Sequence, residues 1–173
     1  NTQVLKGGID LVAGTIVDAT FMRARALRAF LREEIAKAKA EDILFSLHMK
    51  ATMMKVSDPI IFGHAVSVFF ENLFDKHEAL FTELGVNPNS GLGDVLARLT
   101  DHPEILAEFD AVHAANPPLY MVDSDKGITN LHVPSDVIID ASIPAVIRAG
   151  GKGWGPDGNV LDTKCVIPDN CYA

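Results

Sequence analysis

One apolar run of strand length constrains the fold of this chain more than any other feature. Residues 43–49 read Ile-Leu-Phe-Ser-Leu-His-Met and are apolar on both alternating faces apart from Ser46 and His48. A strand that is buried on both faces has this composition, and such strands occur in parallel sheets that are covered by helices. The run therefore predicts a buried, parallel strand.

Helical patterns flank this strand. Before it, apolar residues recur at helical spacing from Leu27 to Ala38, and Asp18 is a candidate N-cap. After it, Asp58-Pro59 joins a capping residue to a proline suited to the first helical position. Helices alternate with short strands along most of the remaining chain. This order predicts an α/β fold class, with helices packed on a mostly parallel sheet.

The length of 173 residues leaves room for one domain. We expect residues 1–173 to form a single α/β domain or a segment of a larger one. In the tail, residues 152–173, Asp157-Gly158 stands between two short β-like runs and predicts a hairpin.

Composition excludes several classes of partner. The formal net charge of -8 argues against nucleic-acid binding, which requires a concentrated basic surface. Apolar runs stay far below the ~20 residues that cross a bilayer, and no basic-then-apolar leader is visible. Cys165 and Cys171 fit neither a disulfide framework nor a zinc pattern. We expect a cytoplasmic protein with no membrane and no nucleic-acid partner.

Lysines follow the predicted strand at the position where α/β proteins bind ligands. Lys50 would emerge beyond the carboxyl end of the strand, and Lys55 follows in the same polar segment. A lysine close to other cations loses proton affinity and can transfer protons near neutral pH. The alternative is that both are ordinary solvated lysines.

Two acidic segments could hold a cation. The loop at residues 123–130 follows a predicted strand, and it either binds a cation or only forms turns. Asp136 and Asp140 lie four residues apart on a predicted helix, with Asp140 inside an apolar run. A carboxylate there needs a partner or a metal such as Mg²⁺ or Mn²⁺. The alternative is a half-exposed aspartate on an amphipathic face.

Three segments together resemble one family, the monomeric-type NADP-dependent isocitrate dehydrogenases of bacteria. They are residues 45–64, beginning Phe-Ser-Leu-His-Met-Lys, residues 123–140, beginning Asp-Ser-Asp-Lys-Gly-Ile-Thr-Asn, and the sequence Trp-Gly-Pro-Asp-Gly at 154–158. The resemblance covers the whole chain but only part of a family member, from the interior of its large domain. It implies oxidative decarboxylation of isocitrate to 2-oxoglutarate, with NADP as hydride acceptor and Mg²⁺ or Mn²⁺ as cofactor.

The resemblance also assigns roles to residues. Dimeric isocitrate dehydrogenases have a catalytic lysine in a context similar to Lys50-Ala-Thr-Met-Met, which implies that Lys50 is catalytic and contacts substrate together with Thr52. Lys55 is the second choice for the lysine. A metal-binding aspartate of the family is similar in context to Asp140. The catalytic tyrosine, the arginine cluster and most NADP-binding residues of the family lie outside these positions.

The resemblance implies that the isolated chain is inactive, that it normally contacts the remainder of the large domain, and that it self-associates when alone. A different class of function stays open, which is a non-catalytic binding or scaffold module with the same fold.

Overall fold

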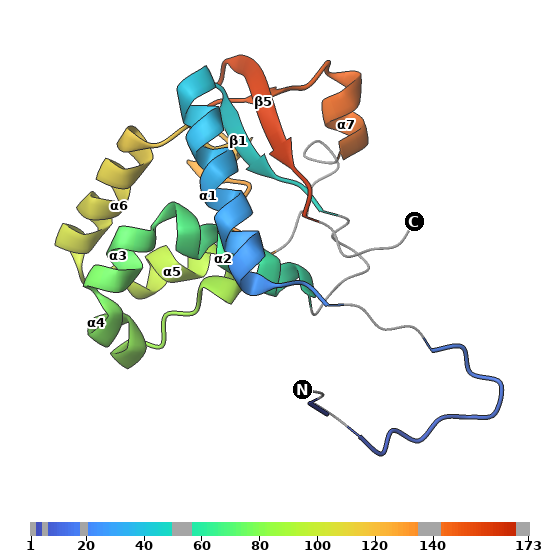
Figure 1. The fold of residues 1–173 in the computed structure, drawn as a ribbon. Helices are drawn as coiled ribbons and strands as arrows, with labels where there is room; N and C mark the ends of the chain where they lie inside the picture. The colour runs from blue at the N-terminus through green and yellow to red at the C-terminus, as the bar shows by residue number, and fades with distance from the viewer. Residues whose placement is uncertain (1–2, 5–6, 18–20, 50–56, 135–142, 169–173) are drawn as a thin grey trace.

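The computed structural model describes residues 3–4, 7–17, 21–49, 57–134 and 143–168. A group of helices lies at one end of the molecule, and the strands with α7 (Ile143–Arg148) lie at the other (Figure 1). The predicted α/β fold class is confirmed.

The main sheet has three strands in the order β1-β5-β4. β1 (Leu44–Leu47) pairs in parallel with β5 (Val160–Val166), while β4 (Lys152–Trp154) pairs with β5 in antiparallel fashion, so the sheet is mixed. β4 and β5 form a hairpin across the turn at Asp157-Gly158, where glycine adopts a positive φ of 75°. Every residue of β1 is buried, and its pairing with β5 is parallel, as its composition predicts.

A second ladder lies on the other side of β1. β2 (Met121–Asp123) and β3 (Ile128–Thr129) form an antiparallel pair. Just before β2, Leu119 forms a parallel bridge with Phe45 of β1. β1 therefore lies between β5 and the segment that enters β2.

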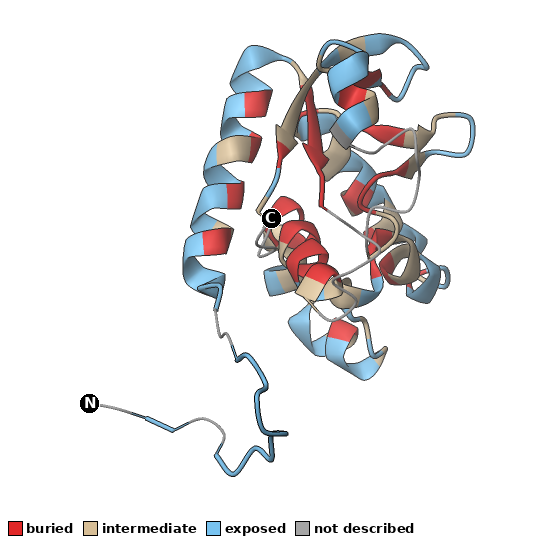
Figure 2. Cartoon of the chain, turned by 90° about the vertical axis from the view of Figure 1, so that its right-hand side faces the viewer, coloured by how far each residue is buried: buried red, intermediate tan, exposed pale blue. Residues whose placement is uncertain are grey.

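α1 (Ala24–Glu41) begins later than Asp18, which lies outside the described residues. Its four buried side chains form the predicted stripe, visible as red bands in Figure 2: Leu27, Leu31, Ile35 and Ala38. Phe21 is 74% exposed, so the residues before Ala24 gain little by packing. Because helices in proteins depend mainly on the burial of an apolar face, α1 starts where that face starts.

The apolar sequence after Pro59 forms two helices. α2 (Ser57–Phe69) is largely buried, and α3 (Glu71–Lys76) follows after a break at Phe70. The other helices that surround them are α4 (Glu78–Glu83), the 3-10 turn η1 (Pro88–Ser90), α5 (Leu92–Arg98) and α6 (Pro103–Ala115).

Aromatic side chains fill the centre of the helical region. The Phe70 ring lies 5.0 Å from Phe69, 4.7 Å from Phe109 and 5.1 Å from His113, measured between centroids. Phe70 is 1% exposed, and it belongs to the same apolar core as β1 and α1.

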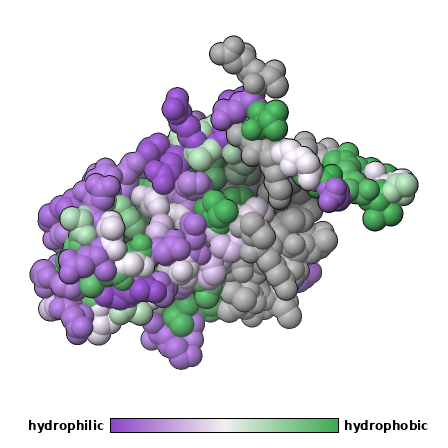
Figure 3. Space-filling model, turned by 90° about the horizontal axis from the view of Figure 1, so that it is seen from below, coloured by the Kyte–Doolittle hydropathy of each residue, from purple (hydrophilic) through white to green (hydrophobic). Residues whose placement is uncertain are grey.

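The described residues at 7–17 extend away from the core (Figure 1). Figure 3 shows hydrophobic surface, in green, on the part that protrudes. The exposed apolar side chains before α1 include Val4, Ile9, Leu11, Val12, Ile16 and Val17. Among the described helices, none combines the length and apolar character that a membrane crossing requires.

Candidate functional site

The predicted site residues follow two parts of the fold that the structure describes. Lys50, Thr52 and Lys55 come after β1, and Asp136 and Asp140 come after the β2–β3 ladder. All five lie outside the described residues. The structure does describe the scaffold from which both segments leave.

His48 is held tightly at the carboxyl end of β1. Its side chain is 0% exposed, and its Nδ1 lies 2.9 Å from Ser46 Oγ. Its backbone N–H donates to Val166 O over 2.9 Å, which extends the β1–β5 pairing by one step. The Tyr120 ring meets the imidazole edge-on, with centroids 5.5 Å apart. The strand is thus fixed up to two residues before Lys50.

Asn130 links the end of β1 to the end of β3. Its Nδ2 donates to Leu47 O over 2.6 Å, and its Oδ1 accepts from Leu47 N–H over 3.2 Å. Its own backbone N–H donates to Tyr120 O over 2.9 Å. Asn130 is 2% exposed, so these hydrogen bonds are made away from solvent.

The turn after β3 is fixed on its other side by α5. Leu92 N–H donates to Leu131 O over 2.8 Å, and Gly93 N–H donates to His132 O over 3.0 Å. These donors belong to the first turn of a helix, where backbone N–H groups have no partner inside the helix. Gly91 allows the close approach, because a Cβ at that position would lie 2.5 Å from His132 O.

The acidic side chain of Asp123 stabilises the turn between β2 and β3. Asp123 Oδ1 accepts from Lys126 N–H over 3.2 Å, and Oδ2 accepts from Lys126 Nζ over 2.7 Å. The hydrogen bond from the Lys126 side chain is the main reason that the pKa of Asp123 lies below its usual value. Both carboxylate oxygens are engaged, which favours the turn interpretation over a cation site.

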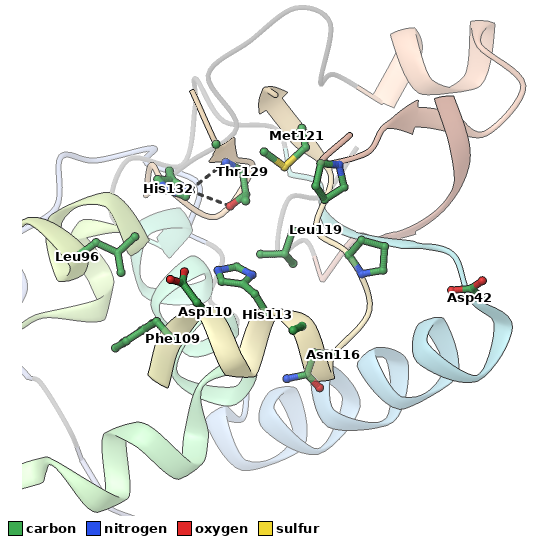
Figure 4. A pocket seen from close by; sticks show the side chains of 14 residues that line it. Asp42, Leu96, Phe109, Asp110, His113, Asn116, Leu119, Met121, Thr129 and His132 are labelled. Carbon is green, nitrogen blue, oxygen red and sulfur yellow. Dashed lines mark hydrogen bonds between the residues drawn. The ribbon is translucent and has the colours of Figure 1, made fainter. Parts of the chain in front are cut away.

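A cavity of about 620 Å³ lies beside the ladder (Figure 4). His113 of α6 and His132 line it from two sides, with Leu119 and Met121 from the segment that enters β2. The pKa of His132 is lowered to about 4, mainly by burial and to a smaller extent by the nearby His113. Burial also lowers the pKa of His113. Both imidazoles are therefore neutral at pH 7.

His132 is oriented by its neighbour Thr129. Its Nδ1 lies 3.0 Å from the Thr129 backbone N, which donates to it, and 2.9 Å from Thr129 Oγ1. Nδ1 is therefore the acceptor nitrogen of a neutral ring. Across the described ranges, no three His, Cys, Asp or Glu side chains gather closely enough to hold a metal ion.

Comparison with known proteins identifies the family. The model of the family described as monomeric isocitrate dehydrogenase matches residues 1–173. The chain belongs to the monomeric isocitrate dehydrogenase family. The predicted resemblance to this family is confirmed.

Curated members of the monomeric isocitrate dehydrogenase family match the chain along its length. The chain is 57% identical to isocitrate dehydrogenase [NADP] 2 of Colwellia maris over 178 residues, which is 100% of this chain and 24% of that protein. It is 53% identical to isocitrate dehydrogenase [NADP] of Azotobacter vinelandii, again with 100% and 24% covered. The Mycobacterium tuberculosis isocitrate dehydrogenase [NADP] 2 is 48% identical, with 99% and 24% covered. These relatives are oxidoreductases, and the chain spans about a quarter of their length.

Sequence reasoning missed the residues that fix the scaffold. Asn130 stands inside one of the segments that resemble the family, but its partner Leu47 is 83 residues away. No local pattern in one sequence marks a side chain whose partner is that distant. Tyr120 lies in the predicted strand before residues 123–130, and nothing in that pattern indicates its contact with His48.

Proposed function

We propose that this chain is a segment of an NADP-dependent isocitrate dehydrogenase, which oxidises and decarboxylates isocitrate to 2-oxoglutarate with a divalent metal, Mg²⁺ or Mn²⁺. The observation that carries this proposal is the family match over residues 1–173, with no part of the segment left unmatched. The NADP-dependent isocitrate dehydrogenases among the relatives support the choice of cofactor and substrate.

Lys50 is proposed as the catalytic lysine, which contacts substrate together with Thr52 and transfers a proton. The support from the fold is its position in the chain. Lys50 follows His48 and Met49 at the carboxyl end of β1, and ligands of open α/β sheets bind beyond the carboxyl ends of strands.

Asp140 is proposed as one metal ligand, with the other ligands supplied by the complete enzyme. When bound, the metal would chelate the hydroxyl and a carboxylate of isocitrate and make that hydroxyl easier to deprotonate. Within the described ranges, no three His, Cys, Asp or Glu side chains gather closely enough to hold the metal by themselves. NADP would likewise be bound mainly outside this segment.

The segment is proposed to act in the cytoplasm, within one large domain. Exposed apolar side chains before α1, such as Ile16 at 95% and Val12 at 81%, support a contact with the remainder of that domain. The same side chains would drive self-association of the isolated chain. Light scattering of the purified chain measures this, and a monodisperse monomer would contradict it.

A segment exchange tests the proposed activity. The matching quarter of the Colwellia maris enzyme is replaced by residues 1–173, and isocitrate-dependent NADPH formation is followed by absorbance with Mn²⁺ present. We expect activity from the hybrid enzyme and none from the isolated chain. An inactive hybrid that is folded would contradict the proposal and favour the non-catalytic scaffold module.

The same hybrid enzyme tests the residue roles. Lys50→Met should lower kcat by at least ~10²–10⁴-fold, since a positioned proton-transfer group is lost. Lys55→Met is the matched control, and a reversed order would move the catalytic role to Lys55. Asp140→Asn should raise the Mn²⁺ concentration needed for half-maximal activity more than Asp136→Asn does. Equal effects would remove Asp140 as the preferred ligand.

A further inference from the structure

We propose that Asn130 is a positioning residue, which sets the backbone leading to Lys50 in register with the backbone leading to Asp140. This inference rests on the proposed function, because it concerns how the two predicted site residues are held relative to each other. It adds a residue that makes no contact with substrate and acts through the main chain.

The hydrogen bonds of β1 show what Asn130 replaces. Phe45 N–H donates to Pro118 O over 2.9 Å, and Tyr120 N–H donates to Phe45 O over 3.0 Å, as between neighbouring parallel strands. Continued pairing would place Leu47 N–H on Tyr120 O. Instead, Tyr120 O accepts from Asn130 N–H, and Leu47 is bonded by the Asn130 side chain. Asn130 is therefore inserted between the two segments.

An asparagine is suited to this position by its chemistry. Its amide offers one acceptor and a donor in the same arrangement as a peptide group, so it satisfies both backbone groups of Leu47. An aspartate would present two oxygens to these groups and would meet Leu47 O without a hydrogen to donate. A shorter side chain would leave buried backbone groups unpaired, which is costly.

The segment around Asn130 has no room to absorb such a change. Beyond it, the carbonyls of Leu131 and His132 are held by the first turn of α5, against Gly91 and Gly93. Because that side is anchored, a shift at Asn130 is taken up mainly by Leu47 and the end of β1.

The two predicted site residues are at unequal distances along the chain. Lys50 comes three residues after Leu47, whereas Asp140 comes ten residues after Asn130. A shorter connection transmits a displacement with less loss. We therefore expect the proton transfer by Lys50 to be slowed more than the affinity for the metal is weakened.

The test uses the hybrid enzyme with Asn130→Asp, and with Asn130→Ser as a smaller second variant. We expect kcat to fall by ~10–100-fold, since a displacement of about 1 Å can have that effect on a reacting group. The KM for isocitrate and the Mn²⁺ requirement should change by smaller factors, and the Kd of NADP⁺ should stay unchanged. Hydrogen exchange, followed by mass spectrometry, should show faster exchange in a peptide that contains Leu47.

A destabilising substitution elsewhere in the core separates positioning from a general loss of stability. Phe81→Leu loosens the helical region, where Phe81 is 3% exposed, without touching Leu47 or Asn130. At a temperature where all variants are folded, Phe81→Leu should keep kcat within about twofold of the unsubstituted hybrid, because a folded site is undisturbed by distant loosening.

Other results would overturn the positioning role of Asn130 or the proposed function on which it rests. A folded Asn130→Asp hybrid with unchanged kcat overturns the proposal, and so does a fall in kcat that Phe81→Leu reproduces. If neither Asn130 variant folds, Asn130 is a folding residue and the positioning role is wrong. If the unsubstituted hybrid itself is inactive, the proposed function fails, while hydrogen exchange at Leu47 in the folded protein still shows whether the link exists.

Discussion

The helical region and the strand region of this molecule are stabilised in different ways. The helical region is built from aromatic and aliphatic side chains such as Phe70, Phe81 and Phe109, which belong to one large core. The strand region shares this core through Phe45, Leu47 and Val166, and it depends in addition on specific contacts. Among these are the Asn130 amide on Leu47 and the close approach of Tyr120 to Gly153. Apolar cores tolerate exchanges that preserve volume, whereas a two-point hydrogen bond or a glycine contact does not. The hydrogen bonds between Asn130 and Leu47 lie three residues before Lys50 in the chain.

The largest loss of stability should come from the helical region. Phe70→Ala removes a ring that is 1% exposed and should lower the free energy of unfolding by ~3–5 kcal/mol. Phe70→Leu, which keeps most of the volume, should cost much less. Phe30→Ala is the matched control, because Phe30 is 39% exposed. Urea denaturation measures all three, and equal losses for Phe70→Ala and Phe30→Ala would contradict this account of the core.

A smaller loss, with a sharper dependence on geometry, is expected at Gly153. A Cβ there would lie 2.1 Å from Cε2 of Tyr120, so the ring has to move. Gly153→Ala should lower the free energy of unfolding by ~1–3 kcal/mol, the usual cost of overpacking. Gly7→Ala is the control, since its nearest neighbour would be 3.7 Å away. If Gly153→Ala proved neutral in denaturation, the strand region would be as adaptable as the helical one.

The effect that is smallest at neutral pH should appear as a dependence on pH. The pKa of His132 is about 4 in the folded chain because of burial, and ~6.5 is usual in an unfolded one. Between these values the unfolded state binds more protons, so the free energy of unfolding falls as the pH falls from ~6.5 to ~4. The contribution of one such group is at most about 1.4 kcal/mol per pH unit.

His132→Asn isolates this contribution. The amide oxygen can accept from Thr129 N–H as Nδ1 does, but it does not titrate. We expect the variant to lose less stability than the unsubstituted chain over this pH range, with parallel curves above pH 7. If the stability curves of the two proteins were parallel at every pH, the pKa of His132 would not be lowered by burial. Carboxylates with lowered pKa values affect both proteins equally and cancel in the difference.

The sequence predicts the helical region well and the strand region only in outline. Apolar periodicity identifies α1, and Asp58-Pro59 marks the beginning of α2, because these signals are local. The break at Phe70 escapes this reasoning, since the apolar pattern continues through it. The residues of β1 are recognisable by composition, but their partners in β5 are more than a hundred positions away.

The candidate site divides in the same way. Family resemblance names Lys50, Thr52 and Asp140, and these assignments stay predictions because all three lie outside the described residues. The supporting contacts of Asn130, His48 and Tyr120 join distant segments, and no spacing within one sequence encodes them. They become visible only when the chain is folded.

The contact between Gly153 and Tyr120 has a consequence for the evolution of this segment. The Tyr120 ring lies against Gly153 and also meets the buried His48 in an edge-on contact. A member of the family that gains a side chain at position 153 must shrink or reorient the ring at 120, and the space beside His48 then has to be refilled. The three positions should therefore change as a set, so that a single exchange from a relative is harmful where the triple exchange is neutral.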